Sequence, residues 1–194
     1  MGRLRRALRI CILDGDPREG NTPLSEALAQ LAAALAARGH QASVLRLQEL
    51  EIQYCVGCFG CWVKTPGRCV FADDSARVCR EVISSDLTVF ASPLVMGYVS
   101  ATLKRAMDKL IPLIHPYTAV IGAEIHHRRR YTRYPRLGLL LEREPGGSDE
   151  DVRLTRRMFE RTAINFHSRL AFVHLAGDPP EEVLDVVDRT RRRV

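Results

Sequence analysis

Four of the six cysteines in this 194-residue chain fall within residues 55–69. Their spacing is Cys55-x2-Cys58-x2-Cys61-x7-Cys69, with glycines between them that let a loop wrap. Thiolates that converge from several directions can hold a 4Fe–4S cluster. Zinc also accepts four thiolates, although structural zinc sites usually draw them from two separate knuckles. A third interpretation is that these are small buried side chains without a metal, and the residues leave all three open.

The remaining cysteines and the start of the chain indicate the compartment. Cys11 falls in an expected strand and Cys79 on an expected helix, so both are predicted to be core residues. The apolar run after the basic N-terminus covers only residues 10–13, too short for a signal peptide, and the expected location is cytoplasmic. Clustered cysteines in a reducing compartment more often bind metal or act in catalysis than form disulfides.

Composition predicts one globular domain over residues 1–194. The chain is 46% hydrophobic and 27% charged, and no apolar run approaches the roughly 18 residues that suggest a membrane span. The formal net charge is +6, but the arginines mostly alternate with acids, as on a solvated helix face. Nucleic-acid binding is therefore disfavoured, and no membrane partner is expected.

Apolar patterning predicts alternating strands and helices. Strands are expected at residues 9–13, 42–47, 87–91, 137–141 and 171–175. Helices are expected at residues 24–38, at 74–84 with Asp74 as the cap, at 101–113, at 149–170 and from Pro179 or Pro180 onward. This alternation is typical of an α/β fold with a five-stranded parallel sheet in the flavodoxin order 2-1-3-4-5.

In such folds a ligand lies beyond the carboxyl ends of the strands, which directs attention to the loops that start near residues 14, 92 and 142. In the first loop, Gly15 and Gly20 permit close backbone approach, and Asn21 or Thr22 can cap the next helix. Free N–H groups there would bind an anion such as phosphate; the alternative is a polar turn with a helix cap. No G-x-G-x-x-G motif is present, so a dinucleotide bound in the usual way is disfavoured.

Three segments of residues 9–110 resemble one known family. The segment GDPREGNT resembles the GSPRxxGNT loop of the NADPH-dependent FMN reductase branch of the flavodoxin-like superfamily. Residues 92–109, SPLVMGYVSATLKRAMDK, resemble that family's loop after the third strand, usually SPVYWGSxSxxLKxxxDR. The cysteine segment, about residues 52–73, is similar to the CxGCxxCxxxGxCxxxDD segment of its iron-sulfur flavoproteins.

The resemblance implies two cofactor sites. In the family the first loop wraps the FMN phosphate and the second lies along the flavin ring and ribityl chain. The residues so implied are Asp16, Arg18, Asn21, Thr22 and Pro23 around the phosphate, and Ser92, Pro93, Leu94, Val95, Met96 and Gly97 along the ring. Cys55, Cys58, Cys61 and Cys69 would hold a 4Fe–4S cluster.

Two positions depart from the family pattern. Asp16 replaces the phosphate-binding serine, so its carboxylate should repel a phosphate unless Arg18 compensates. Val95 and Met96 replace a Tyr-Trp pair, which removes aromatic contact with the flavin but leaves apolar packing.

A basic insertion, about residues 114–135, precedes the fourth strand and is long for a connection in a compact domain. Contact with another subunit of a homo-oligomer is the first interpretation. Arginines interleaved with Tyr131 and Tyr134 would also suit RNA or an NADPH phosphate. A metal on His126 and His127 is disfavoured, because adjacent side chains diverge.

The sequence therefore predicts an FMN-dependent oxidoreductase, with a 4Fe–4S cluster as a second candidate cofactor. Electrons or hydride would pass between NAD(P)H, or an electron carrier, and a small-molecule or electron-carrier acceptor, with no acid–base triad. The rival hypothesis is a cofactor-free flavodoxin-like module that binds a protein or RNA through the basic insertion.

Overall fold

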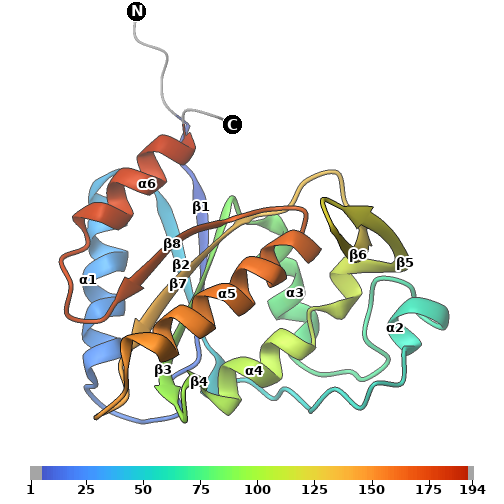
Figure 1. Cartoon of the computed structure of the whole chain (residues 1–194), viewed down its shortest axis with the longest axis horizontal. Coiled ribbons are helices and arrows are strands. Elements are labelled where there is room, and N and C mark those ends of the chain that lie inside the picture. The colour runs from blue at the N-terminus through green and yellow to red at the C-terminus, as the bar shows by residue number, and fades with distance from the viewer. Residues whose placement is uncertain (1–5, 192–194) are drawn as a thin grey trace, which may run out of the picture.

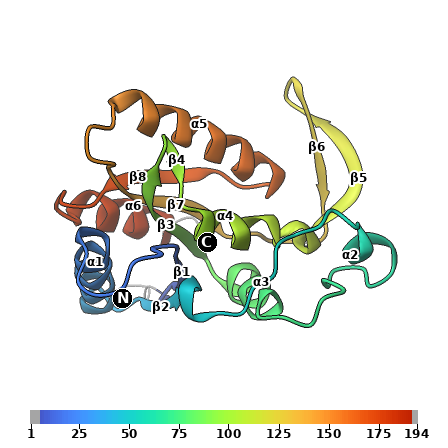
Figure 2. The ribbon, with the colours of Figure 1, turned by 90° about the horizontal axis from the view of Figure 1, so that it is seen from below.

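The computed structural model describes residues 6–191, which form a mostly parallel sheet with helices on both faces (Figures 1 and 2). The strands of this sheet are β1 (Arg9–Asp14), β2 (Gln41–Arg46), β3 (Leu87–Val95), β4 (Tyr98–Val99), β7 (Arg136–Glu142) and β8 (Leu170–Leu175). Five of them are parallel in the order β2-β1-β3-β7-β8, which confirms the predicted order, and β4 adds a short antiparallel pairing with β3.

The helices divide between the two faces. They are α1 (Pro23–Ala37), α2 (Gly60–Val63), α3 (Ser75–Ser84), α4 (Ala101–Asp108), α5 (Asp149–Asn165) and α6 (Glu181–Arg191), with 3-10 turns η1 (Leu47–Glu49) and η2 (Ile111–Leu113). Helices α1 and α6 pack their leucines and valines on one face of β1, β3 and β7. Helices α3, α4 and α5 cover the other face, where Phe90 and Phe159 meet edge to face at 5.3 Å. The layers are seen end-on in Figure 2.

The predicted insertion is a β-hairpin rather than an irregular loop. Strands β5 (Ile114–Ile121) and β6 (Glu124–Arg129) pair antiparallel, and Gly122 turns the chain with φ at 63°. Register is irregular between Ile114 and Thr118, where Pro116 cannot donate a ladder hydrogen bond. The hairpin and α2 lie together at the end of the molecule away from α1 and α6 (Figures 1 and 2).

Three predictions at helix ends are wrong. The helix expected over residues 149–170 ends at Asn165, because His167 adopts the left-handed conformation, with φ at 47°, that terminates a helix. The helix expected over residues 101–113 ends at Asp108, and a 3-10 turn follows, because Pro112 lacks an N–H and its ring clashes with an α-helical turn. Asp74 is at the cap position of α3, but its side chain makes no cap bond, so that prediction is wrong. Its Oδ2 accepts from the Glu51 N–H at 2.9 Å, and Asp73 instead accepts from the Ser75 N–H at 3.0 Å.

Within residues 6–191, no helix combines the length and the apolar character that crossing a membrane requires.

Candidate functional site

The strand order reverses its direction at β1, at the edge of the sheet where the parallel strands end. From β1 the chain continues outward to β2, whereas β3, β7 and β8 extend the sheet in the opposite direction. The loops after β1 and β3 therefore diverge from a common point, and the end of β7 lies beside them. In doubly wound folds this switch point is where ligands bind.

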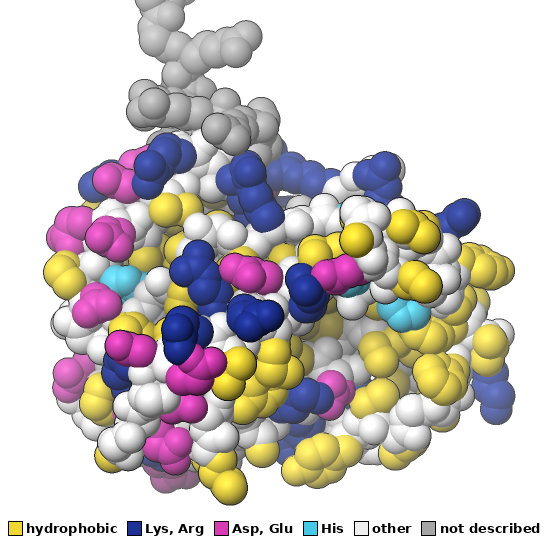
Figure 3. Space-filling model, viewed as in Figure 1, with side chains coloured by type: hydrophobic (Ala, Val, Ile, Leu, Met, Phe, Trp, Pro, Cys, Tyr) yellow, Lys and Arg dark blue, Asp and Glu magenta, His cyan; other side chains and the backbone are white. Residues whose placement is uncertain are grey.

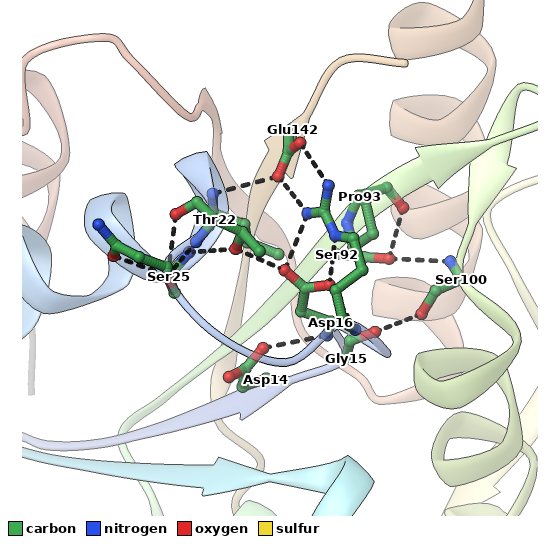
Figure 4. Close-up of polar contacts among 12 residues, drawn as sticks. Asp14, Gly15, Asp16, Thr22, Ser25, Ser92, Pro93, Ser100 and Glu142 are labelled. Carbon is green, nitrogen blue, oxygen red and sulfur yellow. Dashed lines mark hydrogen bonds and ion pairs between the residues drawn. The ribbon is translucent and has the colours of Figure 1, made fainter. Parts of the chain in front are cut away.

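Gly15 allows the first loop to pack closely against β3 and α4. Its N–H donates to the Ala91 carbonyl at 2.9 Å, and its carbonyl accepts from the Ser100 hydroxyl at 2.5 Å (Figure 4). A Cβ at Gly15 would lie 2.5 Å from the Cβ of Leu103. A larger residue would therefore push the loop away from β3 and α4.

The Asp16 carboxylate accepts four hydrogen bonds within the first loop. Its Oδ1 accepts from the Arg18 N–H at 3.0 Å and from Arg18 Nε at 2.8 Å. Its Oδ2 accepts from Arg18 Nη2 at 2.8 Å and from the Thr22 hydroxyl at 2.7 Å (Figure 4). Arg18 thus compensates the Asp16 charge. However, two of the residues expected around a phosphate, Arg18 and Thr22, donate to this carboxylate instead.

Glu142 joins the cluster from the last position of β7. Its carboxylate accepts from Arg18 Nη1 at 2.9 Å, from Arg18 Nη2 at 2.5 Å and from the Leu24 N–H at 3.1 Å (Figure 4). Sequence reasoning did not name Glu142, although it directed attention to the loop starting near residue 142. The remaining phosphate candidates lie on the surface: Asn21 donates to Glu26 at 2.6 Å, and Pro23 begins α1.

The pKa values of Asp14, at the end of β1, and of Asp16 are shifted in opposite directions. Burial raises the pKa of Asp16, but hydrogen bonds from Arg18 and Thr22 outweigh it, so the net pKa lies below its ordinary value. Burial raises the pKa of Asp14, and the negative charge of Asp16 adds to that rise. Asp16 is therefore firmly ionised at neutral pH.

The second loop presents a strained apolar tip. Leu94 pairs with Val99 and Val95 with Tyr98, so Met96 and Gly97 form a two-residue turn. Both have positive φ, 51° at Met96 and 77° at Gly97, a conformation that a methionine rarely adopts. Met96 is 92% exposed.

The six residues predicted along a flavin ring divide into two groups. Ser92, Pro93 and Leu94 are buried, and the Ser92 hydroxyl accepts from the Ser100 N–H at 2.8 Å. They hold the loop in place. Val95 and Met96 are exposed and Gly97 is half-buried, so these positions are the accessible ones.

All four clustered cysteines line one cavity, together with Lys109. Cys55 and Cys58 are exposed, whereas Cys61 and Cys69 are half-buried. Lys109 Nζ donates to the Cys69 sulfur at 3.3 Å. In the described part of the chain, no three His, Cys, Asp or Glu side chains are arranged to hold a metal ion.

Neither of the other two cysteines lines this cavity, although Cys79 lines a neighbouring pocket together with Cys69. Burial raises the pKa of Cys11, in β1, and of Cys79, on α3, to about 12 in each case. Both therefore stay protonated and unreactive at neutral pH.

Two contacts fix the cysteine segment to the rest of the protein. Lys109, on the turn after α4, forms a 3.0 Å ion pair with Asp73, and each side chain is 3% exposed. Trp62 donates from Nε1 to the carbonyls of Ile111 at 3.3 Å and Ile114 at 3.0 Å, and its ring lies 5.1 Å from that of His127 on β6. The segment is thereby held between α4 and the hairpin.

Comparison with known proteins gives matches of three kinds. Residues 8–128 match the NADPH-dependent FMN reductase family. An iron-sulfur flavoprotein of Methanocaldococcus jannaschii is 35% identical over 109 residues, which are 55% of this chain and 53% of that protein. An iron-sulfur flavoprotein of Archaeoglobus fulgidus is 33% identical over 102 residues, 52% of this chain and 44% of that protein. The chain thus spans about half the length of these relatives.

Solved structures share the fold. An NAD(P)H:quinone oxidoreductase from Methanothermobacter marburgensis matches with a TM-score of 0.63 at 16% identity, over 96% of this chain and 94% of that one. A quinone reductase structure from Klebsiella pneumoniae matches with a TM-score of 0.65 at 11% identity, over 96% and 83%.

Proposed function

Because the chain belongs to the NADPH-dependent FMN reductase family, we propose that it is an oxidoreductase that binds FMN at the loops after β1 and β3. The observation that carries the proposal is the family match over the same residues that build this switch point. A bound flavin would accept a hydride or single electrons, and the polypeptide would supply position, burial and electrostatics. NAD(P)H is the proposed donor, and a small molecule or an electron carrier is the proposed acceptor.

The surface of these two loops suits the ring end of a flavin better than its phosphate end. Val95 and Met96 are exposed apolar side chains that an isoalloxazine ring would cover. At the other end, Arg18 and Thr22 are bonded to Asp16, so the side chains that could hold a phosphate are engaged within the protein. The protein therefore offers an apolar surface to the flavin ring, whereas Arg18 and Thr22 are already bonded to Asp16 rather than available to the FMN phosphate.

Titration of the purified protein with FMN tests the proposal. We expect saturable binding, followed by bleaching of the flavin absorption when NADPH is added. Met96→Asp should weaken FMN binding at least about tenfold, because a buried methionine contributes roughly 1.5–3 kcal/mol and aspartate tolerates positive φ. Ala29→Asp, on the exposed side of α1, is the matched control and should bind as the unaltered protein does. A protein that shows no FMN binding would refute the proposal.

We also propose that Cys55, Cys58, Cys61 and Cys69 hold a 4Fe–4S cluster. The support is the donor set, four thiols lining one cavity, and the iron-sulfur flavoproteins among the relatives. The side chains do not converge as a metal-holding group in the described residues, so cluster binding would require them to reorient. The cluster would take electrons one at a time.

The β5–β6 hairpin is the proposed contact with a second copy of the chain. Val120 and Ile125 are directly opposite each other and 72% and 73% exposed, and Tyr117 is 68% exposed. Apolar side chains gather over this end of the molecule in Figure 3. The other side of the hairpin packs on α5, where His126 contacts Asn165. One side is thus covered and the other presents apolar surface.

Val120→Asp should weaken self-association, because a charge in an apolar interface is left without a partner. We expect the dissociation constant to rise at least about tenfold, as for a residue central to an interface. Sedimentation or light scattering over a range of concentrations measures it, with Ala29→Asp as the control. A monomeric unaltered protein, or equal effects of the two substitutions, would contradict this assignment.

A further inference from the structure

The N-terminus of α1 already has anions bound to it, and they belong to the protein. A helix N-terminus favours negative charge because its first N–H groups are unpaired within the helix. Here the Leu24 N–H donates to Glu142 at 3.1 Å, and Thr22, the cap residue, donates its hydroxyl to Asp16. Two carboxylates therefore lie where a ligand anion would bind.

Asp16 is saturated and buried. Its two oxygens accept from the Arg18 N–H, Nε and Nη2 and from the Thr22 hydroxyl, all within 3.0 Å, and the residue is 7% exposed. A carboxylate offers about four acceptor sites, so none is left over. The Asp16 carboxylate therefore makes the hydrogen bonds that a bound ligand anion would make.

Arg18 directs four of its five side-chain N–H groups at carboxylates of the protein. Its Nε, Nη1 and Nη2 all donate to Asp16 or Glu142. The three side chains together carry two negative charges and one positive charge, so a phosphate would approach a cluster that is already net negative. Without displacing one of these carboxylates, a phosphate could bind only the second N–H of Arg18 Nη1.

We propose that Asp16 is a built-in occupant of the anion position, and that this chain selects its flavin by the ring and ribityl chain rather than by the phosphate. This inference rests on the proposed function. It specifies the ligand class further, since riboflavin, which has no phosphate, should bind about as tightly as FMN.

Dissociation constants for FMN and riboflavin, measured by quenching of flavin fluorescence on the same protein preparation, test the proposal. We expect the two to agree within about tenfold, equivalent to 1.4 kcal/mol. Asp16→Ser and Asp16→Asn should each shift the ratio at least about tenfold toward FMN, because either removes one of the two internal negative charges and weakens the hold on Arg18 and Thr22, with Glu142 still in place. Thermal unfolding establishes that the variants fold, and the unaltered protein alone already tests the expected ratio.

Glu19→Gln is the matched control. Glu19 is an exposed residue of the same loop, so its replacement removes one negative charge nearby without altering the contacts to Asp16. The FMN-to-riboflavin ratio should stay unchanged. An FMN preference above tenfold in the unaltered protein would overturn the inference and leave the proposed function intact, whereas binding of neither flavin would overturn both. An unchanged ratio in the Asp16 variants, or an equal shift in Glu19→Gln, would also overturn the inference.

Discussion

Replacing Cys58 by serine is expected to reduce bound iron from about four atoms per chain to background, because a 4Fe–4S cluster needs all four thiolates. The same loss is expected for serine at Cys55, Cys61 or Cys69, which line the same cavity. Iron content and visible absorption of anaerobically purified and reconstituted protein are the measurements.

Cys79→Ser is the matched control for these substitutions. The Cys79 thiol donates to the Lys109 carbonyl at 3.3 Å, a contact that a serine hydroxyl can replace, and the residue lies outside the cysteine cavity. It should retain iron, as should Cys11→Ser if that variant folds. Iron-free unaltered protein after anaerobic reconstitution would exclude the cluster and leave the flavin as the sole redox group, whereas iron retained by Cys58→Ser would refute the four-thiolate site.

Lys109→Met is expected to lower the free energy of unfolding by about 3–5 kcal/mol, because it leaves Asp73 charged and buried without its partner. Urea denaturation of reduced, metal-free protein measures this change without any contribution from a cluster. Adding Asp73→Asn should recover part of the loss, since the unpaired charge is removed.

Lys104→Met, on the helix that Lys109 follows, is the control. Lys104 pairs with Asp108 at 2.6 Å, but the two side chains are 45% and 46% exposed, so we expect a change within about 1 kcal/mol. Similar losses for the two lysine substitutions would contradict the importance of burial at Lys109.

The effect of Lys109→Met should depend on pH. Burial raises the pKa of Asp73, but hydrogen bonds from Ser75 and Lys109 outweigh it, so the net pKa lies below its ordinary value of 3.8. A depressed carboxyl pKa contributes stability that is present above pH 3.8 and is lost as the pH falls through the lower value of the folded state. The difference between unaltered protein and Lys109→Met should therefore be large at pH 7 and shrink below about pH 4.

The sheet was predictable because its determinants are local. Strands such as residues 87–91 are short apolar runs, α1 carries leucines every three or four residues, and alternation of the two leaves few topologies. The hairpin was missed because Pro116 and the irregular register interrupt the alternation of β5. A pattern that is broken near its start gives a weak strand signal.

The site was predictable only as far as its contacts are local in sequence. Arg18 lies two residues from Asp16, so the charges alone indicated that it could compensate the carboxylate. Glu142 lies 124 residues from Arg18, so its arrival depends on where β7 ends in the folded sheet. The ion pair between Asp73 and Lys109 was likewise hidden, because nothing in either neighbourhood indicates burial of the other.

Trp62 is the chain's single tryptophan, and its position makes the intrinsic emission of this protein a local signal. The indole stacks on Phe59 at 5.4 Å, contacts the His127 ring and bonds to the backbone at the start of β5. It also lies next to Cys61 in sequence, so any rearrangement of the cysteine segment changes the surroundings of the fluorophore. Tryptophan emission, excited at wavelengths that the five tyrosines hardly absorb, thus originates at the junction of the cysteine segment and the hairpin, and it can follow events there without an added label.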